Sequence, residues 1–307
     1  MDSVKEMMKQ HTNHSDFRDK YQQIIKKVMA DEDIKQFIFL HEDEITQDVL
    51  EKSYAKFHEF IKERDARING KPVSSPGLEP VLQMNVGFVD VIYRPTAEFM
   101  RQQKEKSIKR RLHALNMPKN IAEATFAEVD ITEQRAMIVA EAVELTELMT
   151  KEPKTFHQGL YLSGTFGVGK TFLLGAMANE LAKNGFITTL LHVPSFSMEM
   201  KQAIGTGDVA EKIEIIKKAD ILMLDDIGAE SSSVWFRDEV LGVILQYRML
   251  QELPTFFSSN FTMKELEEHF RVSQRGDDEP LKAKRLMERV RFLAREMELT
   301  GENRRPK

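Results

Sequence analysis

Residues 164–171, Gly-Thr-Phe-Gly-Val-Gly-Lys-Thr, decide the fold of this chain. They match the pattern Gly-x-x-x-x-Gly-Lys-Ser/Thr of a phosphate-binding loop in full. An apolar strand pattern at 160–163 precedes the loop, and a helical pattern at 170–183 follows it. The loop requires this context, because its backbone N–H groups and the N-terminus of the helix together favour an anion. By chance, the pattern would arise in only about 1% of chains of this length.

The residue types of the loop indicate a nucleotide as its ligand. Glycines place no Cβ between the backbone and the β-phosphate. Lys170 is expected to reach the β- and γ-phosphates, and the hydroxyl of Thr171 to bind Mg²⁺. No Asn-Lys-x-Asp element, the usual guanine-reading signal, follows in the chain, which favours ATP over GTP. The residues that we expect to bind the nucleotide are Gly164, Thr165, Phe166, Gly167, Val168, Gly169, Lys170 and Thr171.

Further along the chain, the apolar run 221–224 (Ile-Leu-Met-Leu) ends in Asp225 and Asp226. Four apolar residues predict a buried parallel strand, and ligands collect at the carboxyl ends of such strands. Asp225 would hold Mg²⁺ with its water ligands, and Asp226 would orient or activate the attacking water. Alternatively, Asp226 is a turn or helix-capping residue, because many strands end in Asp.

A third motif, 254–260 (Pro-Thr-Phe-Phe-Ser-Ser-Asn), is a strand that ends in a short amide. Asn260 could hydrogen-bond the γ-phosphate or the attacking water and so report which nucleotide is bound. It could instead open the next helix, since Phe261 and Thr262 follow it. The presence of the first two motifs favours the sensor role.

The C-terminal segment carries a run of basic side chains that we expect on one helix. Most of them should be solvated, although a guanidinium against the γ-phosphate of a neighbouring subunit would stabilise the transferring charge. Spacing alone does not choose among them. The run consists of Lys282, Lys284, Arg285, Arg289, Arg291 and Arg295.

Composition excludes several classes of protein. The chain has 307 residues, enough for two domains or one large one. It has no Cys, and therefore no disulfide, thiolate zinc site, iron–sulfur cluster or cysteine nucleophile. Its net charge of −5 leaves any nucleic-acid contact to a local basic patch. No apolar run of membrane-spanning length and no secretory signal is found, so we expect a cytoplasmic protein without a membrane partner.

The order of patterns along the chain predicts its domains. Residues 1 to about 70 have charged, helical patterns, and two short strands with a turn are predicted within 81–93. A basic helix at 97–115 follows, and strands then alternate with helices, as in a parallel sheet with crossovers. We therefore expect an α/β chain with domains at 1–105 and 131–307 and a basic connecting segment at 106–130.

Four stretches of the C-terminal half are similar to the bacterial replicative-helicase loaders of the DnaI type. They are 224–230 (Leu-Asp-Asp-Ile-Gly-Ala-Glu), 235–240 (Trp-Phe-Arg-Asp-Glu-Val), 247–248 (Tyr-Arg) and 254–260. The resemblance is close over about 155–307. It is looser over 1–130, where Asp-Glu-Asp at 31–33 precedes an Ile-Lys-Gln-Phe helix. The chain is more distantly similar to the DnaC loaders and to the IstB ATPases of insertion elements.

This resemblance implies a P-loop AAA+ domain with a parallel sheet, preceded by a smaller, mainly helical domain with a short β element. In the family, the first domain grips the hexameric DnaB-type replicative helicase. The AAA+ domain hydrolyses ATP, binds single-stranded DNA and can assemble with copies of itself. Such proteins join the other primosome proteins and load the helicase at initiation or restart of DNA replication. The implied cofactors are ATP and Mg²⁺.

The resemblance also assigns individual residues. The phosphate-binding loop corresponds to Walker A, Asp225 and Asp226 to Walker B, and Asn260 to sensor 1. Arg289 matches the arginine finger, and Arg304 is a weaker match to the sensor 2 arginine. The helices expected between 194 and 218 match an insertion that is implicated in holding DNA, and the implied strand order is 5-1-4-3-2. The residues expected to act in hydrolysis are Lys170, Asp226, Asn260 and Arg289.

Two departures from the family pattern affect the predicted chemistry. Many DnaI proteins carry a zinc-binding cysteine cluster in the N-terminal domain, whereas this chain has no Cys and only scattered His. The zinc ribbon is therefore either replaced by apolar packing around 81–93 or absent, and we predict no zinc site and no metal except nucleotide-bound Mg²⁺. Many AAA+ enzymes have Glu where this chain has Asp226. The shorter side chain predicts slow, switch-like hydrolysis.

Three other functions stay open at the level of the sequence. An IstB-like transposition ATPase would have the same core, and the long N-terminal region argues against it. A P-loop kinase for a small molecule would need a lid and an acceptor site, and the motifs at Asp226 and Asn260 argue against it. A nucleotide-gated adaptor would act without hydrolysis, and an Asp226→Asn variant would identify it because loading would survive.

Overall fold

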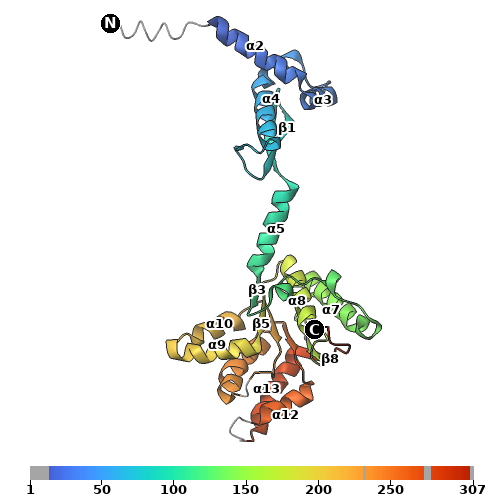
Figure 1. The fold of residues 1–307 in the computed structure, drawn as a ribbon, viewed down its shortest axis with the longest axis vertical. Helices are drawn as coiled ribbons and strands as arrows, with labels where there is room; N and C mark the ends of the chain where they lie inside the picture. Colours follow the sequence, from blue (N-terminus) through green and yellow to red (C-terminus); the bar gives the residue numbers. More distant parts are fainter. Residues whose placement is uncertain (1–13, 231–232, 273–277, 305–307) are drawn as a thin grey trace, which may run out of the picture. The chain divides into compact units, whose positions relative to one another are not determined.

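The computed structural model describes residues 14–230, 233–272 and 278–304. The chain forms two compact units, Met1–Gln103 and Lys104–Lys307, and the division falls within helix α5 (Ala97–Arg111). Figure 1 shows the order of the elements along the chain. No helix among the described residues is long and apolar enough to cross a bilayer.

From residue 14 on, the first unit combines helices with a β-hairpin, as its sequence predicts. A two-residue turn joins the two strands, and its Gly87 has a φ of 77°, which glycine adopts without steric cost. The elements are α2 (His14–Ala30), α3 (Glu32–Leu40), α4 (Gln47–Ile68), β1 (Leu78–Asn85) and β2 (Phe88–Pro95).

A small apolar core holds the hairpin against α4. Ile34, Phe57 and Val89 are fully buried in it. The hydroxyl of Ser53 on α4 donates to Val49 O (2.6 Å) and accepts from Val89 N (2.8 Å), which anchors β2 to the helix. Residues 81–93 are therefore held by apolar packing together with this buried hydroxyl.

The second unit is built on six parallel strands in the order β3-β5-β6-β7-β4-β8. Five of them follow the expected order, with β8 as the fifth strand, and β3 adds an edge beside β5. The strands are β3 (Leu112–Leu115), β4 (Gly159–Ser163), β5 (Thr188–His192), β6 (Ile221–Asp225), β7 (Thr255–Ser258) and β8 (Ala294–Glu298).

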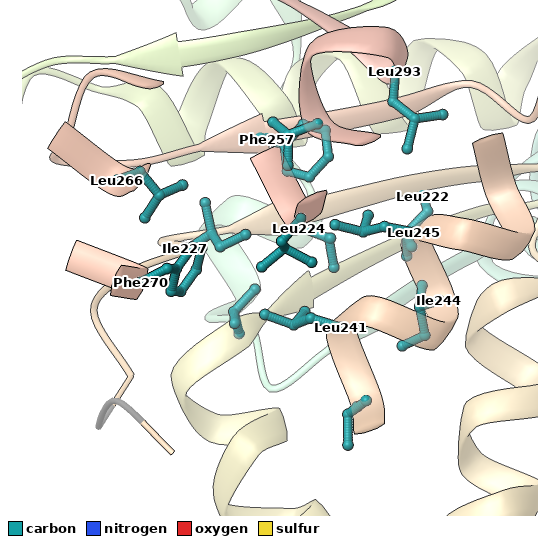
Figure 2. Packing of buried hydrophobic residues seen from close by; sticks show 14 of the residues in the cluster. Leu222, Leu224, Ile227, Leu241, Ile244, Leu245, Phe257, Leu266, Phe270 and Leu293 are labelled. Atoms are coloured by element: carbon teal, nitrogen blue, oxygen red, sulfur yellow. The ribbon is translucent and has the colours of Figure 1, made fainter. Parts of the chain in front are cut away.

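Helices cover both faces of this sheet (Figure 1). Because successive residues of a strand point to opposite faces, β6 sends Leu222 and Leu224 into one core and Ile221 and Met223 into the other. Figure 2 shows Leu222 and Leu224 packed among the side chains of the first core. The burial of both faces explains why the sequence of β6 is continuously apolar.

Helices α7 and α8 belong to one of these cores, and the helices from α9 to α13 to the other. The pair α9 and α10 confirms the two helices predicted within 194–218, and η2 is a π-helical stretch within the helix predicted at 234–250. The helices are α6 (Lys119–Ala122), the 3₁₀ helix η1 (Phe126–Glu128), α7 (Glu133–Lys151), α8 (Lys170–Lys183), α9 (Val193–Thr206), α10 (Val209–Lys217), η2 (Phe236–Leu241), α11 (Gly242–Leu250), α12 (Met263–Arg271) and α13 (Pro280–Leu293).

Two predicted helices end earlier than their sequences indicate. The basic helix expected at 97–115 ends at Arg111, and the next four residues pair with β5 as β3. The C-terminal helix ends at Leu293, so that Arg295 lies on β8 and not on the helix. In both places, strand pairing within the sheet outweighs the local helical pattern.

The segment 106–130 does not form a separate connector. Ile121, Ala124 and Val129 are buried in the same core as α7 and α8. A Cβ built on Gly175 of α8 would lie 2.5 Å from Ile121 O, so the segment and the helix pack closely. The part of the chain that packs with the parallel sheet therefore begins well before the predicted boundary at 131.

Candidate nucleotide-binding site

The phosphate-binding loop connects β4 to α8, as its sequence predicts. Gly167 and Gly169 have φ values of 78° and 97°, in the left-handed region that favours glycine. The side chain of Val168 is buried in the core, so this residue offers a ligand only its backbone. The side chain of Phe166 is 63% exposed and borders the cavity beside the loop.

Lys170 is held above the loop by three oxygen atoms. Its Nζ donates to Gly164 O (2.8 Å), Thr165 O (2.9 Å) and Asn260 Oδ1 (2.9 Å). The side chain of Lys170 is buried, which makes its charge more effective toward an anion in the cavity. The structure therefore brings the first and third sequence motifs together.

Asp225 lies at the end of β6 and is hydrogen-bonded to the loop. Its Oδ1 accepts from Thr171 Oγ1 (2.8 Å) and from Ser258 Oγ (2.5 Å). Burial raises the pKa of the Asp225 carboxyl, and the two hydroxyl groups lower it. A carboxylate beside a hydroxyl is the oxygen donor set that Mg²⁺ prefers, so Thr171 and Asp225 fit this ion.

Asp226 adopts a left-handed backbone conformation, with a φ of 59°. Asp and Asn tolerate this conformation better than most residues. The backbone N–H of Asp226 donates to Ser258 Oγ (2.9 Å), and its Oδ1 accepts from Asn260 Nδ2 (2.8 Å). Asp226 therefore lies in a turn, and its side chain is also hydrogen-bonded to the side chain of Asn260.

Asn260 does not cap the next helix. Helix α12 begins after Thr262, whose Oγ1 accepts from Glu265 N, and Glu265 completes a capping box with the backbone of Thr262. The amide of Asn260 instead contacts Lys170 and Asp226. The helix-opening alternative for Asn260 is therefore wrong.

These side chains border a cavity of about 650 Å³ in the second unit. Its walls also include residues that the sequence motifs did not indicate, from the segment 116–130, the start of α7 and the end of β5. A cavity of this size accommodates a small organic ligand such as a nucleotide. These additional lining residues include Met117, Ile121, Asp130, Arg135 and His192.

The two arginines assigned by resemblance lie in different places. Arg304 borders the cavity, its backbone N–H donates to Gly167 O (3.0 Å), and its guanidinium pairs with Asp130. Arg289 is not among the residues that border the cavity, and its Nη1 donates to Gly242 O (2.7 Å). Within one chain, the structure therefore brings Arg304 but not Arg289 to the phosphate-binding loop.

Sequence reasoning missed two buried ionisable groups near the site. Arg135 is 2% exposed, and its Nη2 would lie 3.0 Å from a Cβ on Gly169. Glu230 accepts from Gly228 N (2.8 Å), and burial, with a smaller contribution from Asp226, raises its pKa to about 7. Glu230 ends the stretch 224–230 that resembles the family, but the motif gave it no role. Arg135 belongs to no sequence motif, and only tertiary contacts bring it to the loop.

Two family models match this chain, and together they cover it. The model described as "Primosomal protein DnaI N-terminus" matches residues 1–93, and the model described as "IstB-like ATP binding protein" matches residues 88–307. The replicative helicase loader DnaI of Bacillus subtilis is 39% identical over 303 residues, which are 96% of each chain. The replicative helicase loader DnaC of Escherichia coli K12 is 26% identical over 106 residues, or 34% of this chain and 43% of the relative.

Solved structures of similar proteins match about two thirds of this chain. A crystal structure of DnaI is 44% identical, has a TM-score of 0.56 and covers 64% of this chain and 99% of the solved one. A putative primosome component from Streptococcus pyogenes is 42% identical, has a TM-score of 0.53 and covers 66% of this chain and 100% of the solved one.

The strand order, the loop after β4 and the carboxylates after β6 define a P-loop ATP-binding domain of the AAA+ class. Both halves of the chain match DnaI, and the identity extends over nearly the whole length. The chain belongs to the DnaI family of replicative helicase loaders. This confirms the resemblance that the sequence motifs indicated.

Proposed function

We propose that this chain is an ATP-switched loader that places the replicative helicase on single-stranded DNA as part of the primosome. One observation supports the proposal that ATP is the switch. Asn260 is hydrogen-bonded to both Lys170 and Asp226, and all three residues border the same cavity. The observation that favours loading over transposition is the match of residues 1–93 to the DnaI N-terminus.

The residues of the cavity divide the chemistry of ATP hydrolysis among them. Lys170 stabilises the negative charge of the transferring phosphate. Thr171 and Asp225 are the residues that would hold Mg²⁺, and the ion would supply further charge neutralisation. Asp226 orients the attacking water and accepts its proton, and Asn260 fixes the Asp226 carboxylate. Because Asp is one methylene shorter than Glu, we infer slow hydrolysis that suits a switch.

Self-assembly through the AAA+ domain would complete this site. Arg289 lies away from the cavity of its own chain and is about half-buried. In the family role of an arginine finger, it would reach the γ-phosphate bound by a neighbouring copy. Assembly of copies would therefore explain how Arg289 contributes, whereas Arg304 already borders the cavity of its own chain.

The test of loading is a complex with the host's replicative helicase. We expect the full chain to form a stable, large complex with that helicase in size exclusion with light scattering, with and without Mg-ATP. Residues 1–105 should suffice, because this region contains a buried core of its own. The absence of a complex under every nucleotide condition would contradict the loader function and favour an IstB-like ATPase of transposition.

Three of the six basic side chains of the C-terminal run form ion pairs with acidic neighbours. Lys282 pairs with Asp238 and Glu279, Arg291 with Glu267 and Glu288, and Arg295 with Glu141. Helix α5, in contrast, has no buried residue. Its Lys106, Lys109 and Arg110 form no ion pair with any residue that the structure describes. Single-stranded DNA would therefore be attracted by these α5 side chains more than by the paired Lys282, Arg291 and Arg295.

We expect that replacing Lys106, Lys109 and Arg110 together by Gln weakens binding of single-stranded DNA. Each neutralised phosphate contributes about 0.7 to the slope of log affinity against log salt, so the slope should fall by about 2. The matched control replaces the paired Lys282, Arg291 and Arg295 by Gln and should leave the slope nearly unchanged. Fluorescence anisotropy across a salt series measures both, and the reverse pattern would disprove a DNA contact at α5.

A further inference from the structure

Arg135 is a buried guanidinium without full hydrogen bonding. It lies in the first turn of α7 and is 2% exposed. Its Nη1 donates to Asp130 O (2.8 Å), whereas its Nε has no hydrogen-bond partner among the residues that the structure describes. Buried polar groups of proteins are nearly always hydrogen-bonded, so this Nε requires an explanation.

No carboxylate of the described residues forms an ion pair with Arg135. The carboxylate of Asp130 pairs with Arg304 instead, while its carbonyl holds Arg135. Burial and the nearby Arg304 lower the pKa of Arg135, and Asp130 raises it by less. A buried charge is costly unless it is paired, and the protein residues around Arg135 pair it only in part.

The guanidinium lies where it can reach a ligand of the phosphate-binding loop. Arg135 borders the cavity, and its Nη2 would lie 3.0 Å from a Cβ on Gly169. Gly169 directly precedes Lys170 in the part of the loop whose backbone N–H groups surround the α- and β-phosphates. Asn260 and Asp226, which we expect near the γ-phosphate, contact each other and Lys170 but are not contacts of Arg135.

We propose that Arg135 binds the phosphate chain of the nucleotide, with Nη2 as the donor to the phosphate oxygens that ATP and ADP share. The inference rests on the proposed nucleotide binding and adds a third cation to Lys170 and Arg304. An incoming anion supplies the partner that the buried guanidinium lacks. Because the contact is to shared phosphates, Arg135 contributes equally to the binding of both nucleotides and does not distinguish them.

The test replaces Arg135 by Met in the full chain and measures binding of Mg-ADP and Mg-ATP by calorimetry. Loss of a charge-assisted contact predicts that both affinities fall by about 10- to 100-fold. The thermal midpoint without nucleotide should stay the same or rise, because an apolar side chain replaces an incompletely paired buried charge. An Arg135→Lys variant should recover part of the affinity.

Arg248 provides the matched control for a buried structural arginine. It is fully buried, and its guanidinium donates to Thr255 Oγ1 (2.8 Å), Ala219 O (2.7 Å) and Pro254 O (2.7 Å). It does not border the cavity. Arg248→Met should lower the thermal midpoint without nucleotide and leave the midpoint shift caused by saturating Mg-ADP in place.

Each contrary outcome has a separate meaning. If Arg135→Met binds ADP and ATP like the parent chain, the phosphate contact is wrong while the proposed function stands. If only ATP binding falls, the contact is to the γ-phosphate and the assignment to shared phosphates is overturned. If Arg135→Met lowers the midpoint without nucleotide and retains ADP affinity, its role is structural. If the parent chain binds neither nucleotide, the proposed function fails together with this inference.

Discussion

Replacement of Lys170 by Ala is expected to weaken ATP binding by about 100-fold and to abolish helicase loading at cellular ATP concentrations. The Lys170 ammonium is buried and is held by Gly164 O, Thr165 O and Asn260 Oδ1. In this position it faces the cavity with its charge little screened by water. Calorimetry with Mg-ATP measures the affinity, and loading of the helicase on a single-stranded substrate measures the consequence.

The matched control for this variant is Lys183→Ala, at the other end of the same helix. Lys183 is partly exposed and, among the residues that the structure describes, pairs only with the neighbouring Glu180 (3.1 Å). Exposed pairs of this kind contribute little, so binding and loading should match the parent chain. ATP affinity of Lys170→Ala within threefold of the parent would contradict the assignment of the loop as the nucleotide site.

Replacement of Asp226 by Asn is expected to slow ATP hydrolysis by about 100-fold while ATP affinity changes little. Asn retains an oxygen that can accept from Asn260 Nδ2, and it tolerates the left-handed backbone of this position. It removes the carboxylate that would accept a proton from water. Steady-state phosphate release and calorimetry separate the two effects.

Asp220→Asn is a suitable control for the loss of a carboxylate. Asp220 is exposed, accepts from Ile187 N (3.1 Å) and does not border the cavity, so hydrolysis should be unaffected. Unchanged hydrolysis in Asp226→Asn would exclude Asp226 as the residue that activates water. Loss of hydrolysis with full helicase loading would favour the nucleotide-gated adaptor, in which binding alone acts as the switch.

Much of the fold was predictable because the strongly buried elements have one-sided or continuous apolar sequences. Strand β6 is buried on both faces, and its four apolar residues reveal it without any tertiary information. The hairpin of the first unit is visible in the same way, since strand residues flank a turn with Gly87. In the candidate site, the residues identified in advance lie in contiguous motifs with a defined chemical pattern, except Arg304, which only the family resemblance indicated.

The elements that escaped prediction are those at the edges of the sheet. Strand β8 reads Ala-Arg-Glu-Met-Glu, and three of its five side chains are exposed and charged, so its sequence continues the helical pattern of α13. Strand β3 has four residues directly after a basic helix. Strands β3 and β8 form because β5 and β4 each have a row of backbone N–H and C=O groups that needs hydrogen-bond partners. This pairing depends on the tertiary structure and cannot be predicted from local propensity.

By itself, the sequence determined the phosphate-binding loop, the carboxylates after β6, the amide after β7 and the family. These features are local, since each needs only a strand end and a few side chains in fixed order. The tertiary structure alone decided that Asn260 bridges Lys170 and Asp226, and that Arg135 lies buried beside Gly169. These contacts join residues that are far apart in the chain. Their geometry follows from the packing of α7 and of the strands in the sheet, and the spacing of residues in the sequence does not predict it.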